Sequence, residues 1–219
     1  MKKLWKDNTF KLGILILSFF ISVILVSIFM ELDASQNLNF RLLSPGINGY
    51  ILGSDHFGRD VLSRLIIGAR VSLGVGILAS TISIILGLFF GLVSGYFGKK
   101  VDTLIMRFID IVMAFPVLLL LIAISATFEP SLQITMIAIG MVSWPPMARL
   151  IRAQVLMIRT SEFIKSLEAL GFSHVRIILF HILPNCIAPI IVSFTLGISG
   201  AIIAESSLSF LGLGVQPPT

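Results

Sequence analysis

Long apolar runs alternate with short polar segments along most of this chain. A run of about 17 residues or more is long enough to cross the hydrocarbon core of a bilayer as a helix. Five runs pass this test, and they cover residues 13–30, 71–96, 104–128, 132–148 and 186–204. The pattern predicts an all-α fold, a polytopic transmembrane helical bundle with five spans.

The segment between the first two runs, residues 31–70, is too long to be a simple turn. Its middle is rich in Gly, Pro, Asn and Asp, which is typical of a loop. Near its end, apolar residues recur at the spacing of one helix face, at Val61, Leu62, Leu65 and Ile66. We therefore expect a loop and then an amphipathic helix over residues 60–70 that leads directly into the second span.

The first run is longer than the apolar core of a signal peptide. Such a core has about 7–15 residues, whereas the uncharged run here covers residues 13–30 and can span a bilayer. We expect a retained first span, with residues 1–12 as a short tail before it.

The composition agrees with a membrane protein. Hydrophobic residues make up 56% of the chain and charged residues only 12%, about half of the roughly 25% typical of soluble domains. The single cysteine, Cys186, excludes an intrachain disulfide.

The net charge of +5 reflects topology. With the N-terminus in the cytosol, most of the 16 Lys and Arg residues fall in the tail, in the turn after the second span and in the segment after the fourth. Short cytosolic segments of membrane proteins carry such an excess of positive charge. The distribution predicts a cytosolic N-terminus, an external location for residues 31–70, and no nucleic acid as a partner.

Glycine and proline mark two of the predicted spans. Gly87, Gly91 and Gly95 recur every four positions in the second span, a spacing that lets helix backbones approach closely in lipid. We expect them to serve helix packing. Pro116 removes one backbone hydrogen bond from the third span and is expected to kink it.

Two acidic residues lie near the ends of predicted spans, Asp110 in the third and Glu205 in the fifth. Arg107 and Asp110 are one helical turn apart and can neutralise each other at the membrane interface. Alternatively, Asp110 and Glu205 face a translocation path, since ionisable groups in membrane helices usually face a cavity. Both interpretations remain open at this level.

The sequence has no pattern typical of an enzyme. The histidines, His56, His174 and His181, fall outside the predicted spans and lack the spacing of a metal site. The chain also has no Walker-type phosphate loop and no nucleophile elbow. We expect no catalytic residues, no bound cofactor or metal, and no nucleotide site of its own.

The polar segment after the fourth span, residues 149–184, contains the signals of two short helices. Thr160 or Ser161 can cap the first helix, and Gly171 can end it. Its apolar residues share one face at helical spacing, and they are Phe163, Ile164, Leu167 and Leu170. Ser173 can cap a second helix that ends at Pro184. The pair forms either a protruding docking element or an ordinary interfacial helix pair.

The sequence EFIKSLEALGFSHVRIILFHILPN, which starts at Glu162, resembles the E-A-A loop of membrane subunits of bacterial ABC importers. Gly171, Leu183 and Pro184 match that pattern, while the residues at 165–167 differ from its E-A-A triplet. Further similar stretches are LGSDHFGRDVLSRLIIGARVSLGVG, SGYFGKKVDTLIMRFIDIVMAFP and AIIAESSLSFLGLGVQPPT. Together they resemble the C-type permease of the dipeptide, oligopeptide and nickel group.

The resemblance implies a type I importer permease fold in the bacterial inner membrane. Such a subunit forms half of the pore with a second permease, two cytosolic ATPase subunits use ATP, and an external binding protein delivers short peptides or a nickel complex. Residues 71–219 would form the permease core, and a sixth span, usual in this group, would follow Thr219 and is absent here.

The E-A-A segment of this family is the coupling helix that docks on the ATPase. The resemblance therefore implies a set of docking residues, namely Glu162, Lys165, Ser166, Leu167, Glu168, Ala169, Gly171, Phe172, His174 and Arg176. The alternatives are an ion-coupled secondary transporter, which would require an inverted repeat or an acid near the bilayer midplane, and a membrane scaffold without transport.

Overall fold

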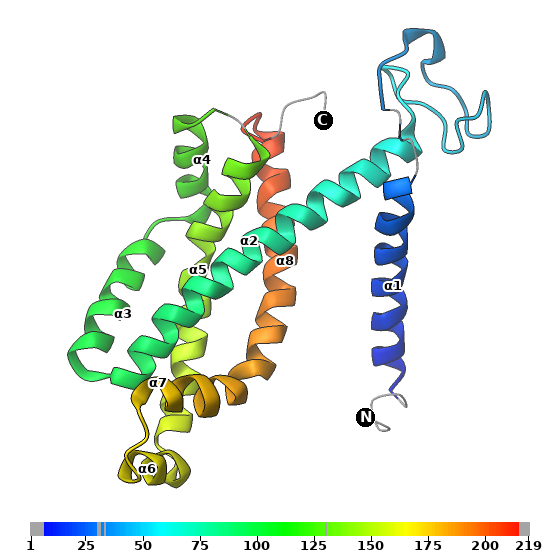
Figure 1. The fold of residues 1–219 in the computed structure, drawn as a ribbon. Helices are drawn as coiled ribbons and strands as arrows, with labels where there is room; N and C mark the ends of the chain where they lie inside the picture. Colours follow the sequence, from blue (N-terminus) through cyan, green and yellow to red (C-terminus); the bar gives the residue numbers. More distant parts are fainter. Residues whose placement is uncertain (1–6, 30–31, 33, 130, 215–219) are drawn as a thin grey trace. The chain divides into compact units, whose positions relative to one another are not determined.

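The computed structural model describes residues 7–29, 32, 34–129 and 131–214, and this part of the chain is helical with no strand. Figure 1 shows the helices. Two compact units, residues 1–72 and 73–217, are described separately below. The all-α prediction is confirmed for the described residues.

In the part of the chain that the structure describes, four helices are long and apolar enough to cross a membrane, and a broken pair of helices could supply a fifth span. The four are α1 (Asn8–Phe29), α2 (Val61–Phe97), α5 (Leu132–Arg159) and the helical run His174–Phe210 that ends in α8 (Ile187–Phe210). The broken pair consists of α3 (Lys99–Met113) and α4 (Val117–Thr127). These helices contain the five predicted apolar runs apart from a few boundary residues and residues 114–116, the break inside the third run.

The first unit contains α1 and a folded loop with a short 3-10 helix, η2 (Leu38–Phe40). Asp55 organises the loop. Its carboxylate accepts the backbone N–H groups of Phe57 and Arg59 at 2.8 and 3.0 Å, and it pairs with the side chains of Arg59 and Arg64 at 2.8 and 2.6 Å. Gly58 has a φ of +73°, and a Cβ there would lie 1.7 Å from the carbonyl oxygen of Asn37. The bonds of Asp55 and the close approach at Gly58 therefore fix the backbone conformation of the loop.

α2 begins in this loop. The carboxylate of Asp60 accepts hydrogen bonds from the N–H and the hydroxyl of Ser63 at 3.0 and 2.6 Å, which satisfies the helix N-terminus. The amphipathic helix predicted over residues 60–70 forms the first turns of α2. It continues without a break to Phe97.

α5 packs directly on the three predicted packing glycines of α2. A Cβ at Gly87 would lie 2.4 Å from Met147, one at Gly91 would lie 2.8 Å from Ile151, and one at Gly95 would lie 2.7 Å from Val155. The contacts advance together along both helices, so α2 and α5 run parallel. Close backbone approach of this kind stabilises helix pairs in lipid through van der Waals contact.

A single residue, Gly98, separates α2 from α3. Gly98 has a φ of +62° and Lys99 a φ of +48°. The N–H of Gly98 still donates to the carbonyl of Ser94 at 3.0 Å, and its own carbonyl accepts from the N–H of Asp102 at 3.1 Å. The chain therefore reverses direction in a tight corner.

Pro116 ends one helix and starts another, so the kinked third span is a correction to the sequence prediction. α3 stops at Met113, Pro116 occupies the N-cap of α4, and the two axes differ by 77°. The ring of Pro116 cannot continue the hydrogen-bond ladder. The fourth predicted span, residues 132–148, is also longer than expected, because α5 reaches Arg159 and contains Pro145 and Pro146.

Two ion pairs explain the extra length of α5. Arg152 binds both carboxylate oxygens of Asp102 on α3, and Arg149 pairs with Asp110 on α3 at 2.5 Å. The arginines that we expected to end the membrane helix are thus neutralised by the neighbouring helix. Asp110 pairs with Arg149, so the expected pair with Arg107 is wrong.

The helix predicted to begin at Ser173 does not end at Pro184, which is a further correction. α7 (His174–Ile177) continues through a π-helix, η3 (Ile178–Ile182), and a 3-10 turn, η4 (Leu183–Cys186), into α8. Pro184 lies in the first turn of η4, where a missing N–H is tolerated. The second short helix is therefore the start of the last long one.

Candidate functional site

α6 (Glu162–Ala169) lies at the end of the second unit where α2 passes into α3 (Figure 1). Ile164 is fully buried and Leu167 is 8% exposed, and both join a core cluster with Tyr96, Val155 and Ile177. Phe163 and Leu170, predicted on the same apolar face, are 55% and 74% exposed. The apolar residues of α6 thus divide between an anchoring face and an outer face.

Leu167, one of the predicted docking residues, is buried, and its part in docking stays a prediction. Its side chain contacts this chain's own core, so it holds α6 in place. The other predicted residues of α6, which are Glu162, Lys165, Ser166, Glu168 and Ala169, are exposed. Beyond α6, Gly171, His174 and Arg176 are exposed and Phe172 is half-buried. The outer face therefore combines apolar and charged side chains.

Tyr96, at the end of α2, connects α6 to α7. Its ring is 2% exposed, and its hydroxyl donates to the carboxylate of Glu168 at 3.3 Å. The same oxygen lies 2.8 Å from Nδ1 of His174. Since the hydroxyl donates to Glu168, a protonated Nδ1 completes the chain of hydrogen bonds.

Arg159, the last residue of α5, covers the other side of this link. Its guanidinium lies 5.5 Å from the centre of the Tyr96 ring, within range of a cation–π contact. Tyr96 is therefore in contact with three segments, α5, α6 and α7.

Gly171 ends α6 in a left-handed conformation with a φ of +78°. Its N–H donates to the carbonyl of Glu168 at 3.0 Å, and the N–H of Phe172 donates to the carbonyl of Leu167 at 3.2 Å. This pair of bonds is a Schellman motif, which favours glycine at that position. The guanidinium of Arg176 lies 4.9 Å from the Phe172 ring and packs over the turn.

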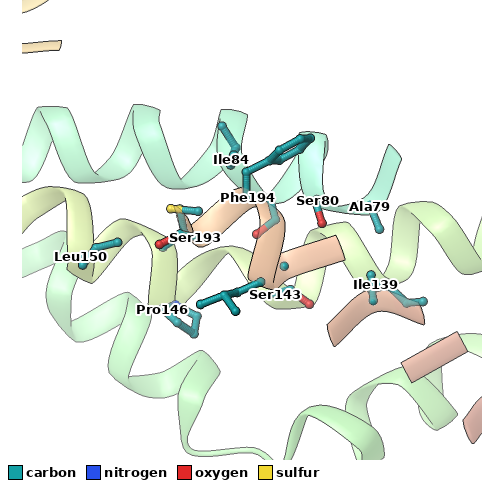
Figure 2. A pocket seen from close by; sticks show the side chains of 14 residues that line it. Ala79, Ser80, Ile84, Ile139, Ser143, Pro146, Leu150, Ser193 and Phe194 are labelled. Atoms are coloured by element: carbon teal, nitrogen blue, oxygen red, sulfur yellow. The ribbon is translucent and has the colours of Figure 1, made fainter. Parts of the chain in front are cut away.

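A cavity of 310 Å³ lies between α2, α5 and α8 (Figure 2). Neither residue proposed for a translocation path lines it. Asp110 has a 61% exposed side chain and pairs with Arg149. Glu205 is 8% exposed and accepts a hydrogen bond from Ser209 at 2.7 Å. The cavity is instead lined by aliphatic side chains and serine hydroxyls.

Sequence reasoning missed Tyr96, Asp102 and the role of the arginines of α5. Tyr96 lies at the end of an apolar run and has no spacing signal. The basic residues after the fourth span indicated topology, and a pattern of basic residues does not reveal that Arg152 pairs with Asp102 and that Arg159 covers Tyr96.

Comparison with known proteins gives a consistent result. Residues 83–219 match the sequence profile of the family described as binding-protein-dependent transport system inner membrane component. The chain is 45% identical to the dipeptide transport system permease protein DppC of Alkalihalophilus pseudofirmus, over 99% of this chain and 72% of that protein. It is 36% identical to the oligopeptide transport system permease protein OppC of Haemophilus influenzae, over 99% and 71% of the two chains.

Among solved structures, a crystal structure of an amino acid ABC transporter with histidines has a similar fold. The TM-score is 0.50 at 22% identity, and the match covers 70% of this chain and 77% of that chain. At this identity the likeness concerns the fold alone.

Proposed function

Because the chain belongs to the family of binding-protein-dependent transport system inner membrane components, we propose that it is a permease subunit of an ABC importer that takes up short peptides. Peptide cargo is supported by the relatives at 36–45% identity, which are named as dipeptide, oligopeptide or peptide permeases. An ion-coupled secondary transporter is not favoured by this family.

The partners follow from the kind of system. A second permease subunit would complete the pore, two cytosolic ATPase subunits would supply the energy, and an external binding protein would deliver the peptide. The excess of basic residues supports a cytosolic N-terminus and, with it, a cytosolic location for α6 at the bacterial inner membrane.

We infer that α6 is the ATPase-docking element. The inference rests on the division of its apolar residues into a buried pair and an exposed pair. One face is held in the core by Ile164 and Leu167. The adjoining side of this segment exposes Phe163 and, at the C-cap, Leu170 beside charged residues. An exposed apolar pair rimmed by polar residues is typical of a protein–protein contact.

The anchoring of α6 supports its role in force transmission. α6 follows α5 directly, contacts the end of α2 through Tyr96, and is linked through His174 to the helical run that ends in α8. A displacement of α6 by a closing ATPase would therefore move three long helices together. Rigid-body movement of packed helices is a common form of conformational switching.

The test is a charge placed on the outer face of α6 in the assembled transporter. Leu170→Asp should reduce co-purification of the ATPase and peptide uptake together by about tenfold or more, because a carboxylate in an apolar contact is strongly unfavourable. Leu38→Asp, at a 64% exposed leucine of the loop before α2, is the matched control. Full ATPase association in Leu170→Asp would exclude docking at this face.

The cargo is tested separately with radiolabelled dialanine and a nickel chelate. ATP-dependent uptake of dialanine supports the peptide assignment. Uptake of the nickel chelate alone, or uptake that persists on an ion gradient without ATP, would contradict it.

A further inference from the structure

The cavity between α2, α5 and α8 has a neutral lining. None of the 14 residues that line it in the described part of the chain carries a charge. Figure 2 shows Ser80, Ser143 and Ser193, from the three helices, around the same space. The remaining surface consists mainly of aliphatic side chains such as Ile84 and Ile139. A charged ligand group would find no counter-ion here.

Ser80 lines this cavity and has an unused hydroxyl, whose oxygen is covered by neighbouring atoms in this structure. The residue is 4% exposed, and its hydroxyl has no partner among the described residues. Its neighbour Thr81, by contrast, donates to the carbonyl of Ile77 at 2.7 Å, the usual solution inside a helix. Buried hydroxyls nearly always have a partner, so an unpaired one on a cavity wall indicates a polar atom of a ligand or water.

Gly197 on α8 gives the cavity part of its width. A Cβ at Gly197 would lie 3.1 Å from the hydroxyl oxygen of Ser80. At Gly200, less than one turn further along α8, a Cβ would meet nothing within 4 Å. Of these two glycines, only Gly197 lines the cavity, so Gly200 can serve as its control.

The volume sets the size of the occupant. An apolar cavity of about 150 Å³ accommodates benzene, and 310 Å³ is at the lower end of ligand pockets. The space suits one large uncharged side chain and an adjoining peptide group. It is too small for a long peptide.

We propose that this cavity receives an uncharged side chain of the peptide in transit, with the Ser80 hydroxyl hydrogen-bonded to a peptide group of the cargo. The proposal rests on the proposed function, and it makes the permease itself selective for side-chain size. The two terminal charges of the peptide would lie outside the cavity, because its lining cannot neutralise them.

The experiment compares uptake of dialanine and dileucine by the assembled transporter in proteoliposomes, with one external binding protein throughout. Gly197→Ala should lower dileucine uptake about tenfold relative to dialanine, since one methyl group in an apolar pocket discriminates by roughly this factor. Gly200→Ala should leave the ratio unchanged. Ser80→Ala should raise KM about fivefold for both peptides, because both contain the peptide group.

An unchanged ratio in Gly197→Ala, with normal uptake of dialanine, would overturn the proposal. Loss of the second permease subunit from a monodisperse Gly197→Ala chain would also overturn it, because the cavity would then hold a partner helix. If Gly197→Ala aggregates, Ser143→Val on α5 makes the same cavity smaller. An unchanged ratio of dileucine to dialanine uptake in that variant would then overturn the proposal. Failure of the proposed function is distinct, since the unaltered transporter would then take up neither peptide.

Discussion

The hydroxyl oxygen of Tyr96 lies 2.8 Å from Nδ1 of His174, although 78 residues separate them in the chain. This contact joins the end of α2 to the start of the helical run that leads into α8. Together with the bond from Tyr96 to Glu168, it makes one buried side chain the meeting point of the elements that hold α6.

Tyr96→Phe tests this link, because it removes the hydroxyl and retains the ring under Arg159. We expect a loss of stability of about 1 kcal/mol, the typical value of one buried hydrogen bond. Peptide uptake per ATP hydrolysed should fall while the ATPase still binds. Tyr50→Phe is the matched control. An unchanged ratio of uptake to hydrolysis would show that the hydroxyl does not transmit movement.

Gly171→Ala tests the end of α6. The left-handed conformation of Gly171 costs a residue with a Cβ roughly 1 kcal/mol, although no atom would clash with the new methyl group. Thermal unfolding should show a lower Tm and ATPase association should weaken. Gly200→Ala, in the interior of α8, should raise stability slightly. Equal effects at the two sites would contradict the conformational argument.

Gly91→Ala tests the packing of α2 on α5. The new Cβ would lie 2.8 Å from the carbonyl oxygen of Ala148, so the helices must separate, at a cost of about 1–3 kcal/mol. Gly74→Ala, on the same helix, meets nothing within 4 Å and should raise stability slightly, as Gly200→Ala does. The Tm of Gly91→Ala should therefore be lower than that of Gly74→Ala. Equal Tm values would contradict close packing of α2 on α5 at Gly91.

Two ion pairs between α3 and α5 should differ in strength. The side chains of Arg152 and Asp102 are 30% and 17% exposed, whereas those of Arg149 and Asp110 are 45% and 61% exposed. Arg152→Ala should therefore cost about 2 kcal/mol, and Arg149→Ala less than about 1 kcal/mol. Double-mutant cycles with Asp102→Asn and Asp110→Asn measure each coupling. The reverse order would show that exposure does not govern these pairs.

Acid should loosen the loop around Asp55. Burial raises the pKa of this carboxyl, but hydrogen bonds from the backbone of Arg59 and Phe57 and the charge of Arg59 outweigh burial and hold the pKa far below its ordinary value of 3.8. The carboxylate therefore stabilises the loop above that value. The stabilisation is lost as the pH falls from there towards the lowered pKa.

A spin label at Ile47→Cys should report this change as an increase in mobility as the pH falls from 4 to 2. In Asp55→Asn the label should already be mobile at pH 7, with little further change. A label that is equally immobile at pH 7 and pH 2 would show that Asp55 does not stabilise the loop.

Features that depend on neighbouring residues could be read from the sequence. Ser161 and Gly171 lie at the two ends of α6 as predicted, although the Ser161 side chain makes no capping hydrogen bond. The apolar runs located the long helices. Features that depend on distant partners could not. From the sequence alone, Arg152 indicates that the membrane span has ended. The structure shows that Asp102, 50 residues earlier, pairs with it.

The same limit applies to the two faces of α6. Helical spacing groups Phe163, Ile164, Leu167 and Leu170 together, since all are apolar. Only the positions of Tyr96 and Ile177 determine that Ile164 and Leu167 face inward and the other two face outward.

The corner at Gly98 has a consequence for insertions and deletions. Since a single residue connects α2 to α3, any added residue would rotate α3 about its axis or lengthen the corner. Asp102 and Asp110 would then turn away from Arg152 and Arg149. The number of residues at this corner is therefore constrained more tightly than their identity, and a chain that gains one residue here would lose both ion pairs at once.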